Sequence, residues 1–91
     1  MRYTVIYHED ITKKDLPALG KSVRVRVQKA IEEKLTMSPE VFGAPLEQSL
    51  RGYRKLRVGD YRVIFEIKQE VIIVVMIGHR SSIYGQVKKR I

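Results

Sequence analysis

Cationic residues surround a Gly-Asp pair near the middle of the chain. Lys55, Arg57 and Arg62 alternate with apolar residues on either side of Gly59-Asp60. Arginine presents forked N–H donors that match phosphate oxygens and can stabilise the additional charge of a pentacoordinate transition state, but it cannot act as a base at neutral pH. This stretch is therefore a candidate for binding a phosphodiester.

Proton transfer would need other residues, and His79, Lys55 and Tyr84 are the candidates. Histidine changes charge near neutral pH, whereas lysine and tyrosine need surroundings that lower their pKa values. In RNA the 2′-hydroxyl can attack the adjacent phosphate, so a protein need supply only a base, an acid and positive charge. Structural roles stay open as well: a strand-end histidine, charges on an edge strand that oppose aggregation, and a tyrosine in the core.

A Gly-Asp pair between two alternating runs predicts a β-hairpin with a two-residue turn. Residues that face each other share a side of the sheet, so one face is apolar and the other cationic. Because two arginines directly opposite each other repel, the hairpin favours an anion bound between them. The predicted facing pairs are Val58 with Tyr61, Arg57 with Arg62, Leu56 with Val63, Lys55 with Ile64, and Arg54 with Phe65.

The position of His79 depends on the next turn. If Gln69 and Glu70 form a two-residue turn, Arg62 lies opposite Ile77, and His79 extends along the face that carries the hairpin cations. A turn of a different length would move His79 to the other face, because side chains alternate along a strand.

The remaining segments predict an α+β fold with the order βααβββ and a terminal helix. Two helices pack on a mostly antiparallel four-stranded sheet, and residues 71–77, an unbroken apolar run, form a strand covered on both faces. The other predicted elements are a strand at 2–8, a short helix at 9–19, the main helix at 21–36 with Ser22 as N-cap, a loop at 38–52 pinned to the core by Phe42 and Leu46, and a C-terminal helix at 81–91.

The composition indicates a single domain, residues 1–91, with a polyanionic partner. Eighteen Lys and Arg residues against ten Asp and Glu give a net charge of +8. The chain has no cysteine and two histidines, so disulfides and thiol chemistry are excluded, and neither a metal site nor a cofactor is expected. No apolar stretch has the length of a signal-peptide core or a membrane span, which predicts a cytoplasmic protein.

The segments L-x-G-Y-R-K-L-R-V-G-D-Y-R-V-I-F, an apolar strand ending in G-H-R, and S-I-Y before a basic end resemble the RelE branch of the RelE/ParE toxin superfamily. The resemblance implies a RelE-like fold and the toxin of a type II toxin–antitoxin system. It further implies an endoribonuclease that needs no metal, cuts mRNA in the ribosomal A site and leaves a 2′,3′-cyclic phosphate.

The resemblance also implies site residues and partners. Matched by position, the expected catalytic residues are Lys55, Arg62, His79, Arg80 and Tyr84, and the expected RNA-binding residues are Arg54 and Arg57. An acidic RelB-like antitoxin would cover the basic surface, and the pair would bind operator DNA through the antitoxin. The alternatives are a non-enzymatic ParE-like toxin that inhibits DNA gyrase and an RNA-binding module without catalysis.

Overall fold

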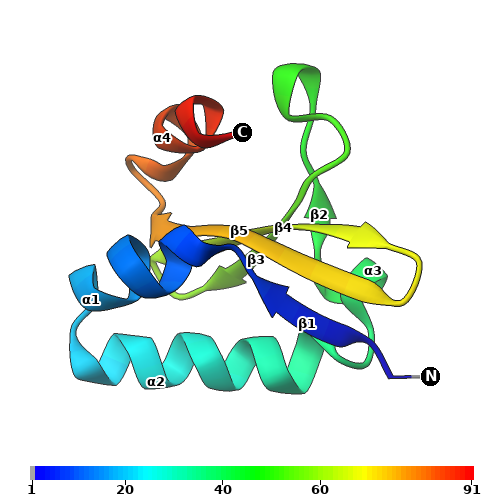
Figure 1. Ribbon diagram of the computed structural model, residues 1–91, viewed down its shortest axis with the longest axis horizontal. Helices are drawn as coiled ribbons and strands as arrows, with labels where there is room; N and C mark the ends of the chain where they lie inside the picture. Colours follow the sequence, from blue (N-terminus) through cyan, green and yellow to red (C-terminus); the bar gives the residue numbers. More distant parts are fainter. Residues whose placement is uncertain (1) are drawn as a thin grey trace.

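A mixed β-sheet separates two layers of helices in the computed structural model, which describes residues 2–91 (Figure 1). The long helix α2 (Lys21–Ala30) lies under one face, and the C-terminal helix α4 (Ile83–Arg90) stands on the other. We call these the α2 face and the α4 face of the sheet. The strands are β1 (Thr4–Tyr7), β2 (Ala44–Pro45), β3 (Arg54–Val58), β4 (Tyr61–Lys68) and β5 (Val71–His79).

The other helical elements are shorter. They are η1 (Ile11–Asp15), α1 (Leu16–Ala18), η2 (Ile31–Leu35), α3 (Pro39–Phe42) and η3 (Gln48–Leu50). The α+β order predicted from the sequence is confirmed, and the predicted main helix corresponds to α2 followed by η2. Among residues 2–91, no helix has both the length and the apolar character that crossing a bilayer requires.

The sheet has the order β1-β5-β4-β3-β2, with β1 parallel to β5 and the other pairs antiparallel. The fifth strand was not predicted, because β2 is a two-residue bridge too short to produce an alternating pattern. Its Pro45 is tolerated since β2 lies at an edge of the sheet. The prediction that residues 71–77 form a strand covered on both faces is confirmed, because β5 lies between β1 and β4 and contributes residues to the cores on both faces.

Each face of the sheet has its own apolar core. On the α2 face, Leu56, Val63 and Phe65 pack against α2 and η2, and all three are buried. On the α4 face, Ile64 packs against the buried side chains of α4. Two thin cores rather than one thick core are what a chain of this length can build around a central sheet.

The hairpin forms as predicted. Gly59 has φ +59°, a conformation that glycine adopts without strain, and every predicted pair from Val58–Tyr61 to Arg54–Phe65 is observed. The second turn is also as predicted, since Lys68 pairs with Val71 across Gln69-Glu70.

The register between β4 and β5 differs from the prediction. A bulge between Ile64 and Phe65 shifts the pairing, so Arg62 faces Gly78 rather than Ile77, and Tyr61 faces His79. The extra residue in β5 is Val75, and Val75 and Met76 both belong to the core on the α4 face. A bulge places two consecutive residues against one of the partner strand, so the alternation beyond it is reversed.

Three smaller predictions are wrong. The N-cap of α2 is Gly20 rather than Ser22, because Gly20 is already extended and its carbonyl accepts the Arg24 N–H at 2.9 Å. The region 38–52 is not a plain loop, since it contains α3, β2 and η3. Phe42 remains 45% exposed, with the Lys34 ammonium 5.5 Å from its ring centroid, whereas Leu46 does pack against the core of the α4 face.

Candidate functional site

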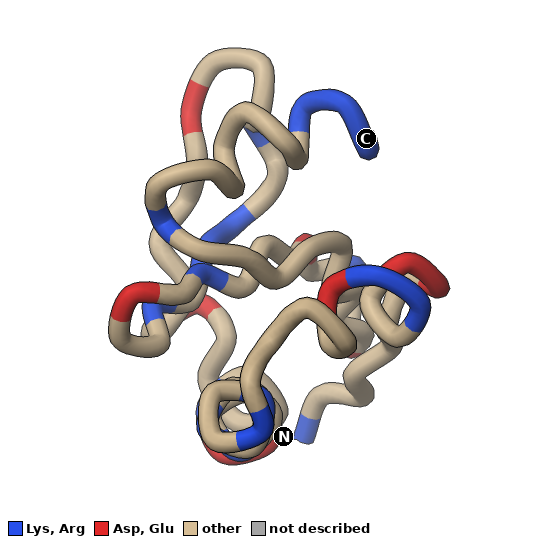
Figure 2. Tube along the Cα trace, turned by 90° about the vertical axis from the view of Figure 1, so that its left-hand side faces the viewer, with Lys and Arg blue, Asp and Glu red and all other residues tan. Residues whose placement is uncertain are grey.

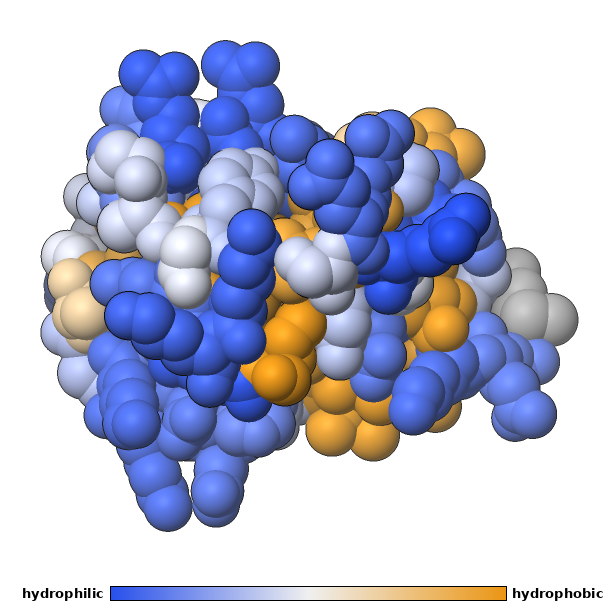
Figure 3. Space-filling view, turned by 90° about the horizontal axis from the view of Figure 1, so that it is seen from above, coloured by the Kyte–Doolittle hydropathy of each residue, from blue (hydrophilic) through white to orange (hydrophobic). Residues whose placement is uncertain are grey.

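The cationic side of the hairpin, formed by Lys55, Arg57 and Arg62, lies on the α4 face of the sheet. We call it the cationic surface. Arg57 pairs with Arg62 and Lys55 pairs with Ile64, which lies under α4. Lys55 and Arg62 are half-buried, and Arg57 is exposed. Figure 3 shows this face from above, where hydrophilic side chains cover most of the surface and apolar side chains are visible between them.

Arg62 bends back over the turn that precedes it. Its Nη1 donates to the carbonyl of Gly59 at 3.0 Å and to the carbonyl of Tyr61 at 2.9 Å. These carbonyl dipoles offset part of the repulsion between Arg62 and Arg57, so the pair does not by itself require a bound anion. A guanidinium has five N–H donors, which leaves the fork able to bind a phosphate.

Arg80 reaches the same turn from the end of β5. Its backbone N–H donates to the Asp60 carbonyl at 2.8 Å, and its Nε lies 3.8 Å from Asp60 Oδ1. Both side chains of that ion pair are more than half exposed, so the contact is worth little energy and can open for a ligand. Arg62 and Arg80 thus flank one turn, although they are far apart in the sequence.

Helix α4 brings Tyr84 to the hairpin. Its buried Ile83 and Val87 dock on the sheet, and the Lys55 ammonium lies 5.5 Å from the centroid of the Tyr84 ring. An ammonium at this distance from an aromatic face is attracted by the ring quadrupole. A cation and a phenol are therefore adjacent at the edge of the cationic surface.

His79 does not join this group. It lies on the α2 face opposite Tyr61, with ring centroids 5.4 Å apart and planes at 82°. Its Nδ1 accepts the Ser81 N–H at 3.1 Å and lies 2.9 Å from Ser81 Oγ. The predicted alignment of His79 with Lys55, Arg57 and Arg62 is wrong, because the bulge at Val75 reverses the alternation that the two-residue turn would have set.

Arg54 also points away from the cationic surface. It pairs with Phe65 on the α2 face, and its Nη1 donates to the Gly43 carbonyl at 2.8 Å. The structure therefore brings together five of the seven expected site residues. These are Lys55, Arg57, Arg62, Arg80 and Tyr84.

The charge distribution favours an anionic ligand on this side of the molecule. Figure 2 shows Lys and Arg positions at the C-terminal end of α4 and on the strands beneath it, with few acidic positions between them. No group of three or more His, Asp or Glu side chains within residues 2–91 gathers closely enough to hold a metal ion.

An ion pair between Asp15 and Arg90, which was not predicted from the sequence, joins the N-terminal helical segment to α4. The two residues are 75 positions apart, and neither belongs to a recognisable motif. In the sequence, Asp15 is recognisable only as an acidic residue in a predicted helix with one apolar face. That does not identify its partner.

Comparisons with known proteins identify the class. The sequence model of the family described as "ParE toxin of type II toxin-antitoxin system, parDE" matches residues 5–84. Toxin RelG of Mycobacterium tuberculosis is 29% identical over 86 residues, which cover 92% of this chain and 98% of RelG. The chain therefore belongs to the RelE/ParE superfamily of type II toxins, in its RelE-like branch.

Solved structures agree with this assignment. The toxin–antitoxin complex RelBE2 from Mycobacterium tuberculosis contains a chain that matches with a TM-score of 0.81 and 26% identity, covering 89% of this chain and 94% of that one. A mutant of E. coli toxin RelE in the free state matches with a TM-score of 0.72 and 27% identity, covering 100% of this chain and 99% of that one.

Proposed function

We propose that this toxin is an endoribonuclease that cleaves mRNA in the ribosomal A site. The observation that carries the proposal is the convergence of Arg62 and Arg80 on one turn, beside the Lys55–Tyr84 pair. Two guanidinium groups on one turn suit a phosphate whose negative charge increases during the reaction.

The roles follow from position. Arg62 and Arg80 hold the scissile phosphate, and Arg57 adds charge beside Arg62. Attack by the RNA 2′-hydroxyl needs a base for that hydroxyl and an acid for the departing 5′-oxygen, and it leaves a 2′,3′-cyclic phosphate. Of the three residues expected to transfer protons, Lys55 and Tyr84 lie on this surface and next to each other, so we assign the proton transfers to this pair. These steps use side chains alone and need no metal.

The proposed partners are mRNA, the ribosome and an acidic RelB-like antitoxin. A net charge of +8 attracts all three by the same long-range electrostatics. The related RelBE2 structure is a toxin–antitoxin complex, which supports the antitoxin assignment. Operator DNA would be bound through the antitoxin, and the place of action would be the cytoplasm, where translation occurs.

Arg62→Ala tests the proposal. Losing a preorganised donor to the transition state typically costs about 10²- to 10³-fold in rate, so we expect growth inhibition to disappear and codon-level cleavage in a translating extract to fall by that factor. Arg62→Lys should recover only part of the activity, because an ammonium lacks the fork.

The matched control is Arg2→Ala, which removes the same charge from an exposed position near the N-terminus. It should keep full activity, and circular dichroism should show that every variant folds. If folded Arg62→Ala and Arg80→Ala both remain fully toxic, the nuclease assignment is wrong.

A non-enzymatic ParE-like toxin is the second candidate, and the description of the matching family favours it. It predicts that expression first induces the DNA damage response, whereas the nuclease predicts that protein synthesis stops first. An RNA-binding module without catalysis would instead bind RNA tightly and release no cleaved product.

A further inference from the structure

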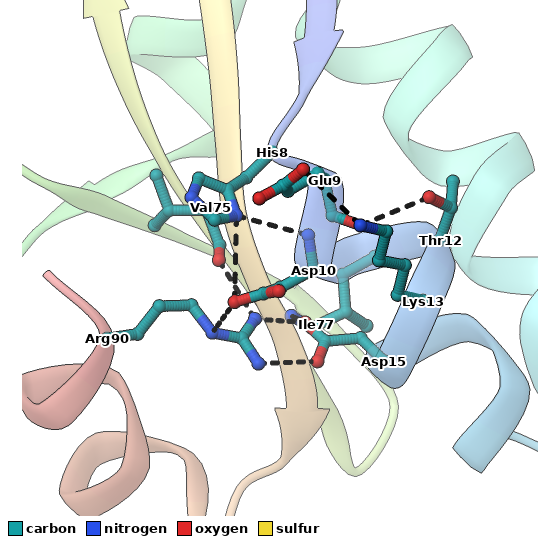
Figure 4. Close-up of polar contacts among 9 residues, drawn as sticks. All are labelled: His8, Glu9, Asp10, Thr12, Lys13, Asp15, Val75, Ile77 and Arg90. Atoms are coloured by element: carbon teal, nitrogen blue, oxygen red, sulfur yellow. Dashed lines mark hydrogen bonds and ion pairs between the residues drawn. The ribbon is translucent and has the colours of Figure 1, made fainter.

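A buried ion pair fixes the end of α4. Asp15 is 6% exposed, and among residues 2–91 it is the one buried residue that is polar or charged. The Arg90 guanidinium grips it with two bonds, Nη1 to Oδ2 at 2.7 Å and Nη2 to Oδ1 at 3.0 Å. Asp10 adds an ion pair to Arg90 Nε at 3.6 Å (Figure 4).

The Asp15–Arg90 pair also bonds to the backbone of β5, at an edge where a neighbouring strand would otherwise do so. Strand β1 ends at Tyr7, opposite Val74, so within residues 2–91 no strand pairs with the second half of β5 on that side. Asp15 Oδ2 accepts the Ile77 N–H at 2.9 Å, and Arg90 Nη1 donates to the Val75 carbonyl at 3.1 Å. Figure 4 shows both side chains meeting at this uncovered edge of β5. Backbone groups at the bulge are thereby satisfied by side chains instead of by a ladder.

Helix α4 needs such a fixed point. It has eight residues, and two of them, Ile83 and Val87, are completely buried. Apolar contacts are not directional, so they leave a short helix free to slide or turn on the sheet. Arg90 adds directional bonds at the last residue, where a cation also interacts favourably with the helix dipole. Bonding to Asp15 is the main cause that raises the pKa of Arg90, so the Arg90 guanidinium stays charged. We call this Asp15–Arg90 ion pair the clamp.

The bonds between Asp15 and Arg90 affect the position of the Tyr84 ring, because both Tyr84 and Arg90 lie on α4. Tyr84 and Arg90 belong to the same helix, about 9 Å apart along its axis at 1.5 Å per residue. Any shift of the clamped end therefore moves the phenol relative to Lys55. The Tyr84 ring lies 5.5 Å from the Lys55 ammonium only while α4 keeps its docked position.

We infer that Asp15 and Arg90 are positioning residues that hold Tyr84 over Lys55 and thereby set the rate of the proposed RNA cleavage. Neither residue touches the cationic surface, and both act through α4. The inference rests on the proposed function for its effect on cleavage, whereas its effect on α4 can be measured without any substrate.

The test compares Arg90→Gln with Lys89→Gln in the full-length toxin. Both changes remove one positive charge from the last turn of α4, but Lys89 is exposed and outside the clamp. A misplacement of about 1 Å can cost up to about a hundredfold, so we expect Arg90→Gln to lower kcat by about ten- to a hundredfold with little change in KM. Lys89→Gln measures the effect of the lost charge alone, and its loss of kcat should be much smaller than that of Arg90→Gln.

A double-mutant cycle with Tyr84→Ala separates positioning from general stability. If the clamp acts through Tyr84, Arg90→Gln should cause no further loss of cleavage once Tyr84 is absent. An equal loss in both backgrounds would overturn the inference. Arg90→Lys, which keeps the charge and one bond, should recover part of the rate, and it serves as the second variant if Arg90→Gln fails to fold.

Hydrogen exchange gives the readout that is independent of RNA. Arg90→Gln should lower the protection of the α4 amides at Gln86 and Val87 while the amides of β4 stay protected. If α4 protection is unchanged in Arg90→Gln, the clamp inference is wrong whatever the toxin does to RNA. If α4 protection falls but the unmodified toxin cleaves no mRNA, the clamp positions α4, and the proposed function together with the link to cleavage is overturned.

Discussion

Replacing His79 with alanine should leave RNA cleavage nearly unchanged, although the sequence makes this histidine a candidate for proton transfer. The bulge at Val75 puts His79 on the α2 face, whereas Lys55, Arg57 and Arg62 lie on the α4 face. A general acid or base must come within hydrogen-bond reach of the proton that it moves. His79 would have to reach around the end of the sheet to do so.

The contacts of His79 indicate how much stability and cleavage activity His79→Ala should lose. Its ring makes one edge contact with Tyr61, and its Nδ1 is occupied by the Ser81 N–H. An edge-to-face aromatic pair is worth about 0.5–1.5 kcal/mol, and His79 is exposed, so the loss of stability should be near the lower limit. Because no contact with the cationic surface is lost, we expect cleavage to change by less than about threefold. Loss of a general acid or base would instead cost about 10²- to 10⁴-fold.

The assay is cleavage of a defined mRNA in a translating extract, measured for His79→Ala beside Lys55→Met and Tyr84→Phe. The last two should fall by about a hundredfold or more if Lys55 and Tyr84 transfer the protons. The pH dependence of cleavage between about pH 6 and 8, where histidines usually titrate, should be the same with and without His79.

A loss of about a hundredfold or more in folded His79→Ala would refute this reasoning, since that is the size of a general acid–base contribution. It would mean that the substrate crosses the end of β5 and meets His79 from the α2 face. A change in pH dependence without a change in maximal rate would also contradict the placement of His79 outside the reaction.

Two further predictions concern stability. Gly43→Ala should lower the free energy of unfolding by about 1–3 kcal/mol, because the added Cβ would overlap the buried ring of Phe65 and lie 2.7 Å from the Pro39 carbonyl. Thermal denaturation measures this, and Gly85→Ala, which meets no atom within 4 Å, is the control and should be neutral or stabilising. The bond from Tyr3 Oη at 2.6 Å lowers the pKa of Glu40, so its stabilisation is present above the ordinary pKa of glutamate and is lost as the pH falls through the lower folded-state value. Glu40→Gln should therefore be slightly less stable at neutral pH and lose less stability on acidification, and acid titrations of both proteins that superimpose would contradict this assignment.

The hairpin and its cationic surface could be read from the sequence because local chemistry sets them. A Gly-Asp turn of two residues fixes the register of β3 and β4, and the observed pairing of Arg57 with Arg62 follows from counting outward from that turn. The main helix and the C-terminal helix were predictable for the same reason, since their apolar spacing is a property of neighbouring residues.

Two features depend on the tertiary structure: the face of the sheet on which His79 lies, and the pairing of Asp15 with Arg90. The residues around the bulge in β5 are all apolar, so the sequence does not show which face of the sheet each side chain takes. Packing under α4 places Val75 and Met76 on the same face. That packing sent His79 to the α2 face. The pairing of Asp15 with Arg90 depends on β1 ending early and leaving the edge of β5 open. The sequence by itself determined which residues share the cationic side of the hairpin, because a short turn sets the parity of its own strands, whereas the positions of His79 and Tyr84 depend on contacts between distant segments.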